Sequence, residues 1–353
     1  MKPPKRTSKF AVAVLALFLI PGAALAQTNP PCNLRTGCLR LATLLPRGTS
    51  QYQALEKMGQ DWRTATNGAV TLVIYGDGTM GTEAESVQRL RVGQLQAVTL
   101  SAAGLSEIDP YLAAIEKVPM LFRSLEEAEY VRDKIAPELE KHLEQKGFVA
   151  LFWADAGWIQ VFSRNPILRP ADLKKTRLLA TPGDPKEIEL IRALEIVPVE
   201  RAWSDALLSL ENGAVDTLVT TPFLCLAGQF NRTAKHYLPL NYVPLAGATI
   251  ISKKAWDSLT PQQREDMSKA AIQAGKRIQA SSRAENTSSI EAMKQRGLQV
   301  HSMPPDAEKE WHAYFEAVYP KVRGNLVPAD IFDEVQQLLA GYRAAPASKA
   351  GHL

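Results

Sequence analysis

The sequence has few of the residues from which metal centres and covalent active sites are built. It contains only 3 cysteines and 5 histidines in 353 residues, and no two histidines share a spacing typical of metal ligands. It also lacks a serine-nucleophile elbow and a phosphate-binding loop. The turn at 76–81 is rich in glycine, but it lacks the strand-to-helix fingerprint with an acidic residue about 20 positions later. These absences argue against an enzyme and against a bound cofactor or metal.

The chain also lacks an excess of charge once its first residues are set aside. Its 41 Lys and Arg residues face 37 Asp and Glu residues, and four of the basic residues lie within the first ten positions. The remainder is neutral, which argues against a nucleic-acid partner and an anionic membrane surface. With 46% hydrophobic and 22% charged residues, the composition is that of a globular protein. The length suits two domains.

The N-terminus has the three parts of a secretion signal. Basic residues precede an apolar run at 10–20, and Ala24-Leu25-Ala26 ends in small residues, so we predict cleavage after Ala26. The run is shorter than the roughly 20 residues that span a membrane, and Pro21 interrupts it. No later segment is long and apolar enough to span. We therefore expect an exported, soluble protein.

The three cysteines fit an oxidising compartment without requiring one. Cys32 and Cys38 are close enough in sequence to close a small loop, and the sequence leaves their pairing open. Cys225 remains, and we expect it to be a buried, unreactive thiol.

Apolar periodicity alternates between strand and helix along the chain. Strands are predicted at 39–44, 70–74, 95–100, 148–153, 159–163, 177–180, 215–220 and 249–252. Capping residues predict helix starts at Ser50, Thr82, Ser124, Asp184, Ser204 and Thr260. This alternation predicts an α/β fold whose sheets are largely parallel and covered on both faces.

Two of these helices carry further predictions. The helix that begins at Ser124 is expected to break near Pro137. The helix that begins at Thr260 extends as far as Arg296, which is unusually long for a globular domain. We expect it to bend or to bridge two lobes.

A series of short motifs resembles the extracytoplasmic solute receptors of TRAP transporters, the DctP type. The motifs lie, in order, at 41–46 (LATLLP), 75–83, 89–94 (RLRVGQ), 118–122 (VPMLF), 172–174 (DLK), 206–216 and 252–261. No single motif is diagnostic, because each could be generic turn or capping chemistry. Their order along residues 39 to about 340 carries the resemblance.

The resemblance implies an α/β two-lobe periplasmic solute-binding-protein fold with crossing hinge strands and a long interlobe helix. We place the signal peptide at 1–26, lobe I at 39–157 and 247–285, lobe II at 158–246 and 286–343, and a flexible tail at 344–353. A small-molecule ligand closes the lobes, and the loaded receptor delivers it from the periplasm to the membrane permease subunits of the TRAP system. Neither catalysis nor a cofactor is implied.

The sequence departs from the family where a ligand carboxylate is usually held. Members typically clamp it with an arginine that follows the Asp-Leu-Lys motif, and Leu179 occupies that position. Ile159 occupies the position of a second arginine found in sialic-acid-type members. A carboxylate sealed in a cleft without a partner costs several kcal/mol. We therefore expect an apolar or amphiphilic ligand with a neutral polar end.

The resemblance also assigns cleft positions to other side chains. We expect ligand contacts from the aromatic residues Trp153, Trp158, Trp203 and Phe223, the aliphatic residues Leu45, Ile159 and Leu179, and the hydroxyl residues Ser101, Thr181 and Thr221. Arg47 or Arg201 could replace the missing guanidinium, which keeps an organic-acid receptor open as an alternative. A lipid-handling binding protein that partners a helical-repeat protein is a second alternative. Asp155 is the one acidic residue near the cleft that we retain as a candidate.

Overall fold

The structure is a computed structural model that describes residues 32, 34, 37–182 and 184–345. The predicted secretion signal at 1–26 and all but the first two residues of the predicted tail lie outside the described residues. So does Gly183.

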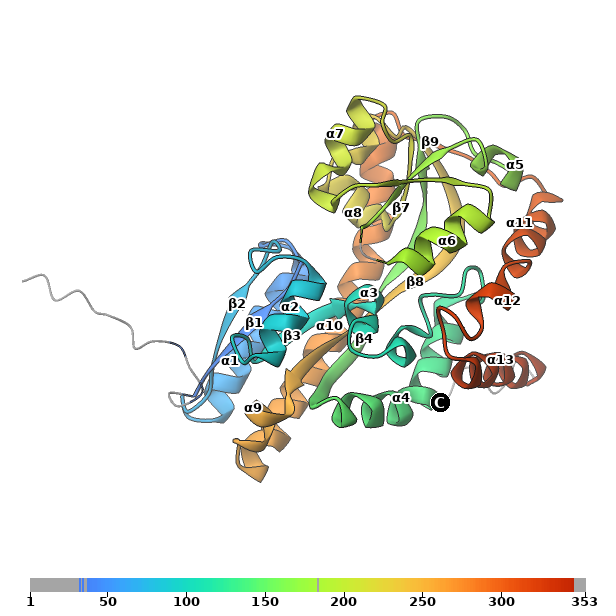
Figure 1. Cartoon of the computed structure of the whole chain (residues 1–353). Helices are drawn as coiled ribbons and strands as arrows, with labels where there is room; N and C mark the ends of the chain where they lie inside the picture. The colour runs from blue at the N-terminus through green and yellow to red at the C-terminus, as the bar shows by residue number, and fades with distance from the viewer. Residues whose placement is uncertain (1–31, 33, 35–36, 183, 346–353) are drawn as a thin grey trace, which may run out of the picture. The chain divides into compact units, whose positions relative to one another are not determined.

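One mixed sheet of nine strands runs through the described chain (Figure 1). The strands are β1 (Cys38–Ala42), β2 (Thr71–Tyr75), β3 (Ala97–Ser101), β4 (Phe148–Ser163), β5 (Arg177–Ala180), β6 (Val197–Glu200), β7 (Thr217–Thr220), β8 (His236–Ser252) and β9 (Gln299–Val300). Their order is β2-β1-β3-β8-β4-β7-β5-β6, and β9 pairs with β8.

Helices cover both faces of this sheet. They are α1 (Ser50–Ala65), α2 (Glu83–Arg91), α3 (Ala102–Ser106), α4 (Leu125–Gln145), α5 (Pro170–Leu173), α6 (Pro185–Ala193), α7 (Ala206–Glu211), α8 (Pro222–Ala227), α9 (Lys253–Asp257), α10 (Pro261–Gln295), α11 (Ala307–Glu316), α12 (Tyr319–Val322) and α13 (Ala329–Ala344). Short 3₁₀ turns are η2 (Pro110–Ala113), η3 (Trp203–Asp205) and η4 (Phe230–Arg232).

The sheet consists of two parallel groups joined by two long strands. Strands β1, β2 and β3 are parallel to one another, as are β5, β6 and β7. Between the groups, β4 and β8 pair antiparallel to each other. The predicted α/β class is confirmed, with the parallel strands in two separate groups.

Three local predictions need correction. The strands predicted at 148–153 and 159–163 are one strand, β4, and 249–252 is only the end of β8. The break predicted near Pro137 is wrong, because α4 continues to Gln145. Pro137 removes one backbone donor, but Ile135, Leu139 and Leu143 on the same helix are buried in the core. Their burial outweighs the lost hydrogen bond.

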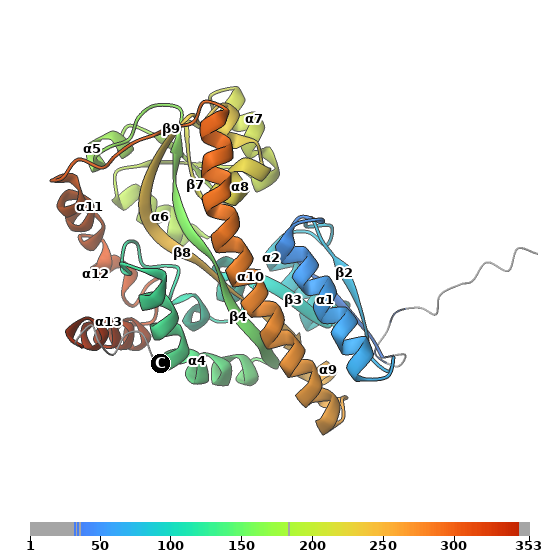
Figure 2. The same cartoon turned by 180° about the vertical axis from the view of Figure 1, so that it is seen from behind.

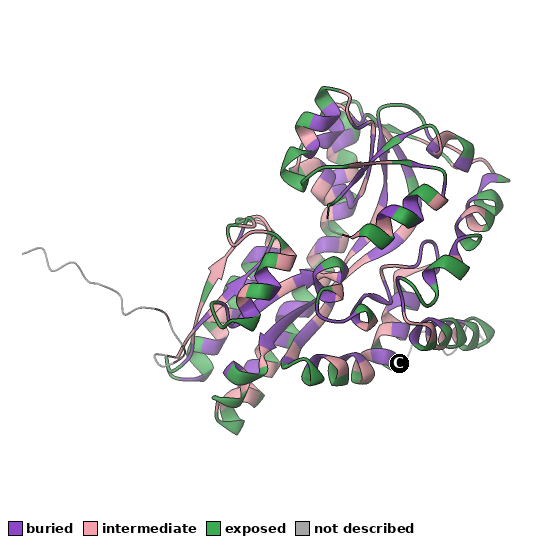
Figure 3. Cartoon of the chain, in the orientation of Figure 1, coloured by how far each residue is buried: buried purple, intermediate pink, exposed green. Residues whose placement is uncertain are grey.

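Helix α10 is one continuous helix that runs beside β4, as Figures 1 and 2 show from opposite sides. Its start is fixed by a capping box between Thr260 and Gln263. Small residues face the sheet and allow close contact: a Cβ on Gly275 would lie only 2.8 Å from the ring of Phe152. Figure 3 shows the buried residues of the helix on the side that faces the strands. The helix therefore bridges the two strand groups, packing on α1 at one end and α8 at the other.

The segment where β4 and β8 cross between the two strand groups is irregular. We call residues 155–159 of β4 and 243–246 of β8 the crossing segment. The register shifts between the Asp155–Ala246 and Trp158–Pro244 pairs, which marks a β-bulge. Gly157 in this bulge has φ +86°, a conformation that glycine adopts without strain.

Side chains of α10 hold the bulge in place. Asn286 donates from Nδ2 to the Ala156 carbonyl (2.8 Å) and accepts from the Phe223 N–H at the start of α8 (3.0 Å). Asp155 accepts from Gln279 (2.8 Å) and from Arg283 (3.0 Å), and Arg283 also pairs with Glu129 of α4. The acidic residue retained from the sequence therefore anchors the crossing segment.

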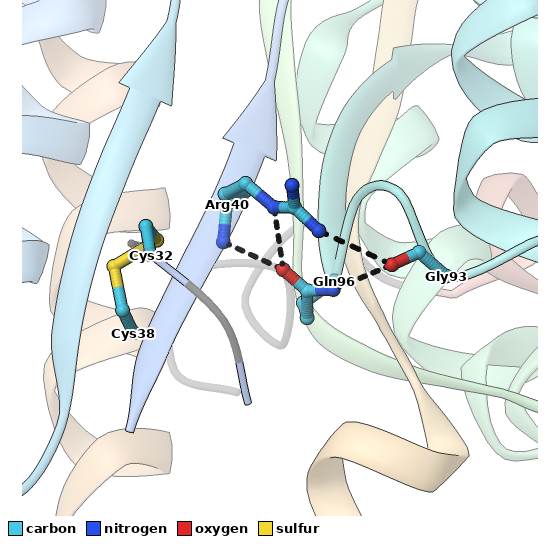
Figure 4. Close-up of a disulfide and its surroundings, with 5 residues drawn as sticks. All are labelled: Cys32, Cys38, Arg40, Gly93 and Gln96. Atoms are coloured by element: carbon cyan, nitrogen blue, oxygen red, sulfur yellow. Dashed lines mark hydrogen bonds between the residues drawn. A yellow bond between two sulfur atoms is a disulfide. The ribbon is translucent and has the colours of Figure 1, made fainter. Parts of the chain in front are cut away.

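The N-terminal end of the described chain is tied to β1. Cys32 and Cys38, whose pairing the sequence left open, form a disulfide (Figure 4). Beside it, Gln96 accepts from the backbone and side-chain nitrogens of Arg40, at 3.1 and 3.3 Å, and donates to the Gly93 carbonyl. Cys225 is fully buried, and burial raises the pKa of its thiol, as the sequence predicted for an unreactive cysteine.

The bulge predicts a difference between two glycine substitutions. Gly157 and Gly297 both have positive φ, but a Cβ on Gly157 would lie 2.4 Å from Asn286 Nδ2, whereas none meets Gly297 within 4 Å. Gly297→Ala should cost about 1 kcal/mol of unfolding free energy from backbone strain alone. Gly157→Ala should cost at least about 2 kcal/mol, because it also displaces a hydrogen-bonded amide. Urea unfolding measures both, and equal losses would contradict this account of the bulge.

Candidate functional site

The carboxyl ends of the two parallel strand groups face each other across the crossing segment. Ser101, at the end of β3, pairs with Gly247, which in turn pairs with Ala154 of β4. Thr220, at the end of β7, pairs with Gln160 of β4. Because β3 runs parallel to β4 and β7 runs antiparallel to it, both carboxyl ends point toward residues 155–159. Ligands of open α/β sheets bind at such carboxyl ends.

We call the ends of β1, β2 and β3 with the residues that follow them the first edge. The ends of β5, β6 and β7 with the residues that follow them are the second edge. The stretch of β4 between the two edges spans at most about 20 Å of extended chain. A small molecule between the edges can therefore contact both.

Three of the predicted ligand residues gather at the second edge. The Arg201 N–H donates to the Ala180 carbonyl (3.0 Å), which brings Arg201 beside Thr181. Both side chains are exposed. Trp203 follows at the start of η3 with 42% of its surface exposed, and its ring meets Phe230 edge-on at 5.2 Å. This edge therefore combines a guanidinium, a hydroxyl and an indole.

The charge of Arg201 is available at this edge. Its guanidinium donates to the Glu200 carbonyl (2.7 Å), and it forms no ion pair within the described residues. Arg47 at the first edge differs, because Asp77 binds both its side chain (3.3 Å) and its N–H (2.9 Å).

Other predicted residues lie deeper in the second half of the sheet. Thr221 is buried and uses its hydroxyl to cap α8, where Leu224 N–H donates to it (3.3 Å). Phe223 is half-buried in the first turn of that helix. Leu179 is 7% exposed and packs with Ala206 and Phe230.

The predicted residues of β4 contact the core more than the edges. Trp153 and Trp158 are half-buried against the largest hydrophobic cluster. Ile159 is half-buried opposite Val243 of β8. Trp153 also borders a small cavity of about 10 Å³ shared with α3, α4 and Glu116.

The first edge holds Leu45 and Ser101. Leu45 is half-buried, and its N–H donates to the Thr43 hydroxyl (3.1 Å). Ser101 ends β3 and caps α3, and it also binds Glu83. The Glu83 carboxylate accepts from Ser101 N–H (2.7 Å), Ser101 hydroxyl (2.6 Å) and Gly104 N–H (2.9 Å). Burial raises the pKa of Glu83 above its ordinary value, and these hydrogen bonds offset part of the rise.

A second carboxylate, which the sequence analysis passed over, lies at the crossing segment. Glu116 accepts from the Ala246 N–H (3.1 Å), and burial raises the pKa of Glu116 to about 8. Glu116 and Lys117 interrupt the apolar stretch from Leu112 to Phe122. Two adjacent charges within an apolar run were the available signal, because such a run is buried and its charges must find partners.

The arrangement supports binding more than bond-breaking chemistry. The described residues contain no group of three His, Cys, Asp or Glu side chains that could hold a metal ion. The edges offer hydrogen-bonding, charged and aromatic side chains, which suit recognition of a small molecule.

The comparisons with known proteins agree on a family. The family model for bacterial extracellular solute-binding proteins, family 7 (DctP), matches residues 41–325. The chain belongs to this family. The C4-dicarboxylate-binding periplasmic protein DctP of Rhodobacter capsulatus is 25% identical over 259 residues, or 73% of this chain and 78% of the relative. The 2,3-diketo-L-gulonate-binding periplasmic protein YiaO of Escherichia coli is 26% identical over 83% of this chain and 88% of its own length.

Solved structures of TRAP periplasmic solute-binding proteins share the fold. One from Chromohalobacter salexigens, with bound D-glucuronate, has a TM-score of 0.78 at 18% identity and covers 85% of this chain and 99% of its own. One from Xanthobacter autotrophicus, with bound β-D-galacturonate, has a TM-score of 0.77 at 20% identity, covering 86% and 99%. The predicted two-lobe fold with crossing strands and a long interlobe helix is confirmed.

The DctP-family chain is an extracellular solute-binding receptor and not an enzyme, and its solved structural neighbours are TRAP periplasmic solute-binding proteins. Receptors of this kind bind small molecules and deliver them to membrane permease subunits. In the part of the chain that the structure describes, no helix has both the length and the apolar character needed to cross a membrane.

The comparisons do not favour the apolar ligand that the sequence led us to expect. Each ligand named for these four proteins is an organic acid. They also give no support to the lipid-handling alternative with a helical-repeat partner. The expectation rested on Leu179 and Ile159 at positions where relatives carry guanidiniums, and it kept Arg201 only in the organic-acid alternative. The Arg201 side chain is exposed at the second edge.

The raised pKa of Glu116 predicts a pH dependence of stability. Its folded pKa of about 8 exceeds its ordinary value of 4.5, so the folded state holds a proton that the unfolded state releases between these values. Stability is therefore highest below about pH 4.5 for this group and falls as pH rises to about 8, by at most about 1.4 kcal/mol per pH unit.

Glu116→Gln keeps an acceptor for the Ala246 N–H but cannot ionise. The variant should gain stability relative to the wild type as pH rises from about 5 to about 8, measured by urea unfolding. Glu56→Gln, on an exposed position of α1, is the control for loss of a carboxylate. We compare the unfolding free energies of the wild type and of Glu116→Gln at each pH. If their difference stays constant across this range, Glu116 is ionised in the folded protein and the prediction is wrong.

Proposed function

We propose that this receptor captures a small organic acid with an apolar face, and that the ligand bridges the first and second edges when the lobes close. A ligand that contacts both edges only in the closed form shifts the equilibrium toward closure. The apolar part of our original expectation is retained only as one face of an acidic molecule.

The observation that carries this proposal is that Arg201 and Trp203, two positions apart, both expose their side chains at the second edge. A guanidinium can hold a carboxylate through two charge-assisted hydrogen bonds, and Arg201 forms no ion pair among the described residues. Trp203 offers an exposed ring on which the C–H face of a sugar acid or an aliphatic segment can pack. At the first edge, Leu44 is 49% exposed and adds apolar surface.

The relatives support the same ligand class. The ligands named for them are a C4-dicarboxylate, 2,3-diketo-L-gulonate, D-glucuronate and β-D-galacturonate. We therefore take hexuronates as the first probes. In this proposal the exposed Thr181, which follows β5, donates to a ligand hydroxyl or carboxylate, whereas Leu179 is packed in the core and contributes shape.

The lobe boundaries and the export route remain part of the proposal. We propose that the lobes divide within the crossing segment, with lobe I at 39–157 and 247–285 and lobe II at 158–246 and 286–343. One contact crosses this division. Arg343 of α13, in the lobe II range, binds Glu127 of α4, in the lobe I range, through two hydrogen bonds of 2.8 and 2.7 Å. Export to the periplasm with cleavage after Ala26 completes the proposal.

Ligand binding tests Arg201 and Trp203 directly. D-Glucuronate and D-galacturonate should raise the melting temperature of the protein, while 1-octanol should not. Arg201→Ala should weaken uronate binding by about tenfold to hundredfold, because a charge-assisted pair is lost. Trp203→Ala should weaken it by about tenfold through lost apolar contact. Calorimetry gives the dissociation constants.

Arg232→Ala is the matched control, since Arg232 is an exposed arginine on η4 whose side chain donates to Gln229 (3.3 Å) and forms no ion pair within the described residues. It should leave the dissociation constant unchanged. Tight binding of an uncharged apolar compound, or equal affinities for the Arg201 and Arg232 variants, would refute the organic-acid proposal.

A further inference from the structure

The segment from Glu116 to Arg123, which we call the strap, joins η2 to α4 and is fastened to the crossing segment. Glu116 accepts from the N–H of Ala246. Met120 donates its N–H to the Tyr242 carbonyl (2.7 Å) and adopts φ +50°, which is unusual for a non-glycine residue. Tyr319 donates to the carbonyl of Pro119 (2.8 Å). The strap is therefore fixed to the strands on which the two lobes turn.

Lys117 extends from the strap to the second strand group. Its Nζ lies 3.0 Å from Asp184 Oδ2, and it also pairs with the carboxylate of Glu187. The lysine side chain is only 10% exposed, whereas those of Asp184 and Glu187 are 36% and 45% exposed. Burial alone would lower the pKa of Lys117, but the two carboxylates outweigh it and raise the pKa above its ordinary value.

The two acids belong to the second edge. Asp184 caps α6 by accepting from the Glu187 N–H (3.1 Å), and it follows shortly after Thr181 at the end of β5. Lys117 lowers the pKa of Asp184 against the opposing effect of burial. Asp184 and Glu187 at the start of α6 are thus held by a cation from the strap.

This ion pair differs from an ordinary surface pair. An exposed pair contributes about 0–1 kcal/mol, because water screens it and its side chains lose freedom. Here the cation is nearly buried, and its removal would leave two neighbouring carboxylates without their shared partner. Breaking it should therefore change where the start of α6 lies.

We infer that Lys117 is a positioning residue for ligand binding, which holds the Thr181 side of the second edge in place before the ligand arrives. Ordering a binding wall in advance removes part of the entropy cost of binding. This inference rests on the proposed function, because it assigns Thr181 and Arg201 to the ligand wall. It adds a determinant of affinity that does not itself contact the ligand.

Substitution of Lys117 tests the inference. Lys117→Gln should weaken hexuronate binding by about tenfold. Lys117→Arg, which keeps the positive charge, should bind within about threefold of the wild type. In an Asp184→Asn/Glu187→Gln background, adding Lys117→Gln should have little further effect, because the partners are already absent. Lys186→Gln is the control, since the side chain of this nearby lysine of α6 donates to the Asn325 carbonyl (2.8 Å) and, among the described residues, forms no ion pair with Asp184 or Glu187.

A ligand-free measurement separates this inference from the proposed function. The amides of Glu187 and Ile188, which bond to Asp184, should exchange with solvent about tenfold faster in Lys117→Gln and unchanged in Lys186→Gln. If the wild type binds no organic acid, the proposed function fails while the exchange still tests Lys117. The inference is overturned if Lys117→Gln keeps the wild-type exchange rates or the wild-type affinity for hexuronates. It is also overturned if Lys117→Gln weakens binding as much in the Asp184→Asn/Glu187→Gln background as in the wild type.

Discussion

The pairing of β4 with β8 is the constraint on which the rest of the molecule depends. These strands remain paired from Phe148 to Ser163, yet their register shifts three times, and the central shift forms the crossing segment. A regular ladder there would be stiff, whereas a bulge twists and bends the strands. Both parallel groups are attached to this pair, so a change in the crossing segment moves one edge relative to the other.

Helix α10 limits that freedom through polar side chains on one face. Gln279, Arg283 and Asn286 follow one another at i, i+4 and i+7 on one helix face, and they bind the bulge at Asp155 and Ala156. One position away, Ser282 accepts from Gln51 of α1 (3.1 Å). The same helix thus binds α1 beside the first strand group, the bulge, and, through the Phe223 N–H, the start of α8 beside the second strand group. Buried polar contacts of this kind specify one arrangement more than they add stability.

Local signals in the sequence were sufficient for elements whose causes are local. The box of Thr82 with Glu85 starts α2, and that of Thr260 with Gln263 starts α10, as their spacing predicted. Most of β8 escaped prediction because Pro239, Asn241 and Pro244 interrupt its pattern, although long-range pairing with β4 still extends it. Strand β6 was missed for the same reason, since Pro198 lies within it.

The candidate site divides in the same way. The family resemblance assigned Thr181, Arg201 and Ser101 to the cleft, although β6, which precedes Arg201, was not predicted as a strand. The sequence could not show that Leu179 packs into the core, or that Arg47 forms an ion pair with Asp77, because both depend on tertiary neighbours. Nor could it distinguish the enclosed carboxylate of Glu83 from a solvated acid on a helix, since the three donors that enclose it come from the end of β3 and from α3.

The charges around the crossing segment favour one orientation of an acidic ligand within the proposed function. Asp184 and Glu187 share Lys117 there, and hydrogen bonds from Ser101 and Gly104 hold Glu83. Glu116, with a pKa of about 8, adds little charge at neutral pH. Like charges repel, and the repulsion is stronger where water is excluded. A carboxylate is therefore disfavoured at the inner end, beside the strap, and favoured beside Arg201. The hydroxyl-bearing end of the same molecule can face the inner carboxylates, because a hydroxyl donates to them without adding charge.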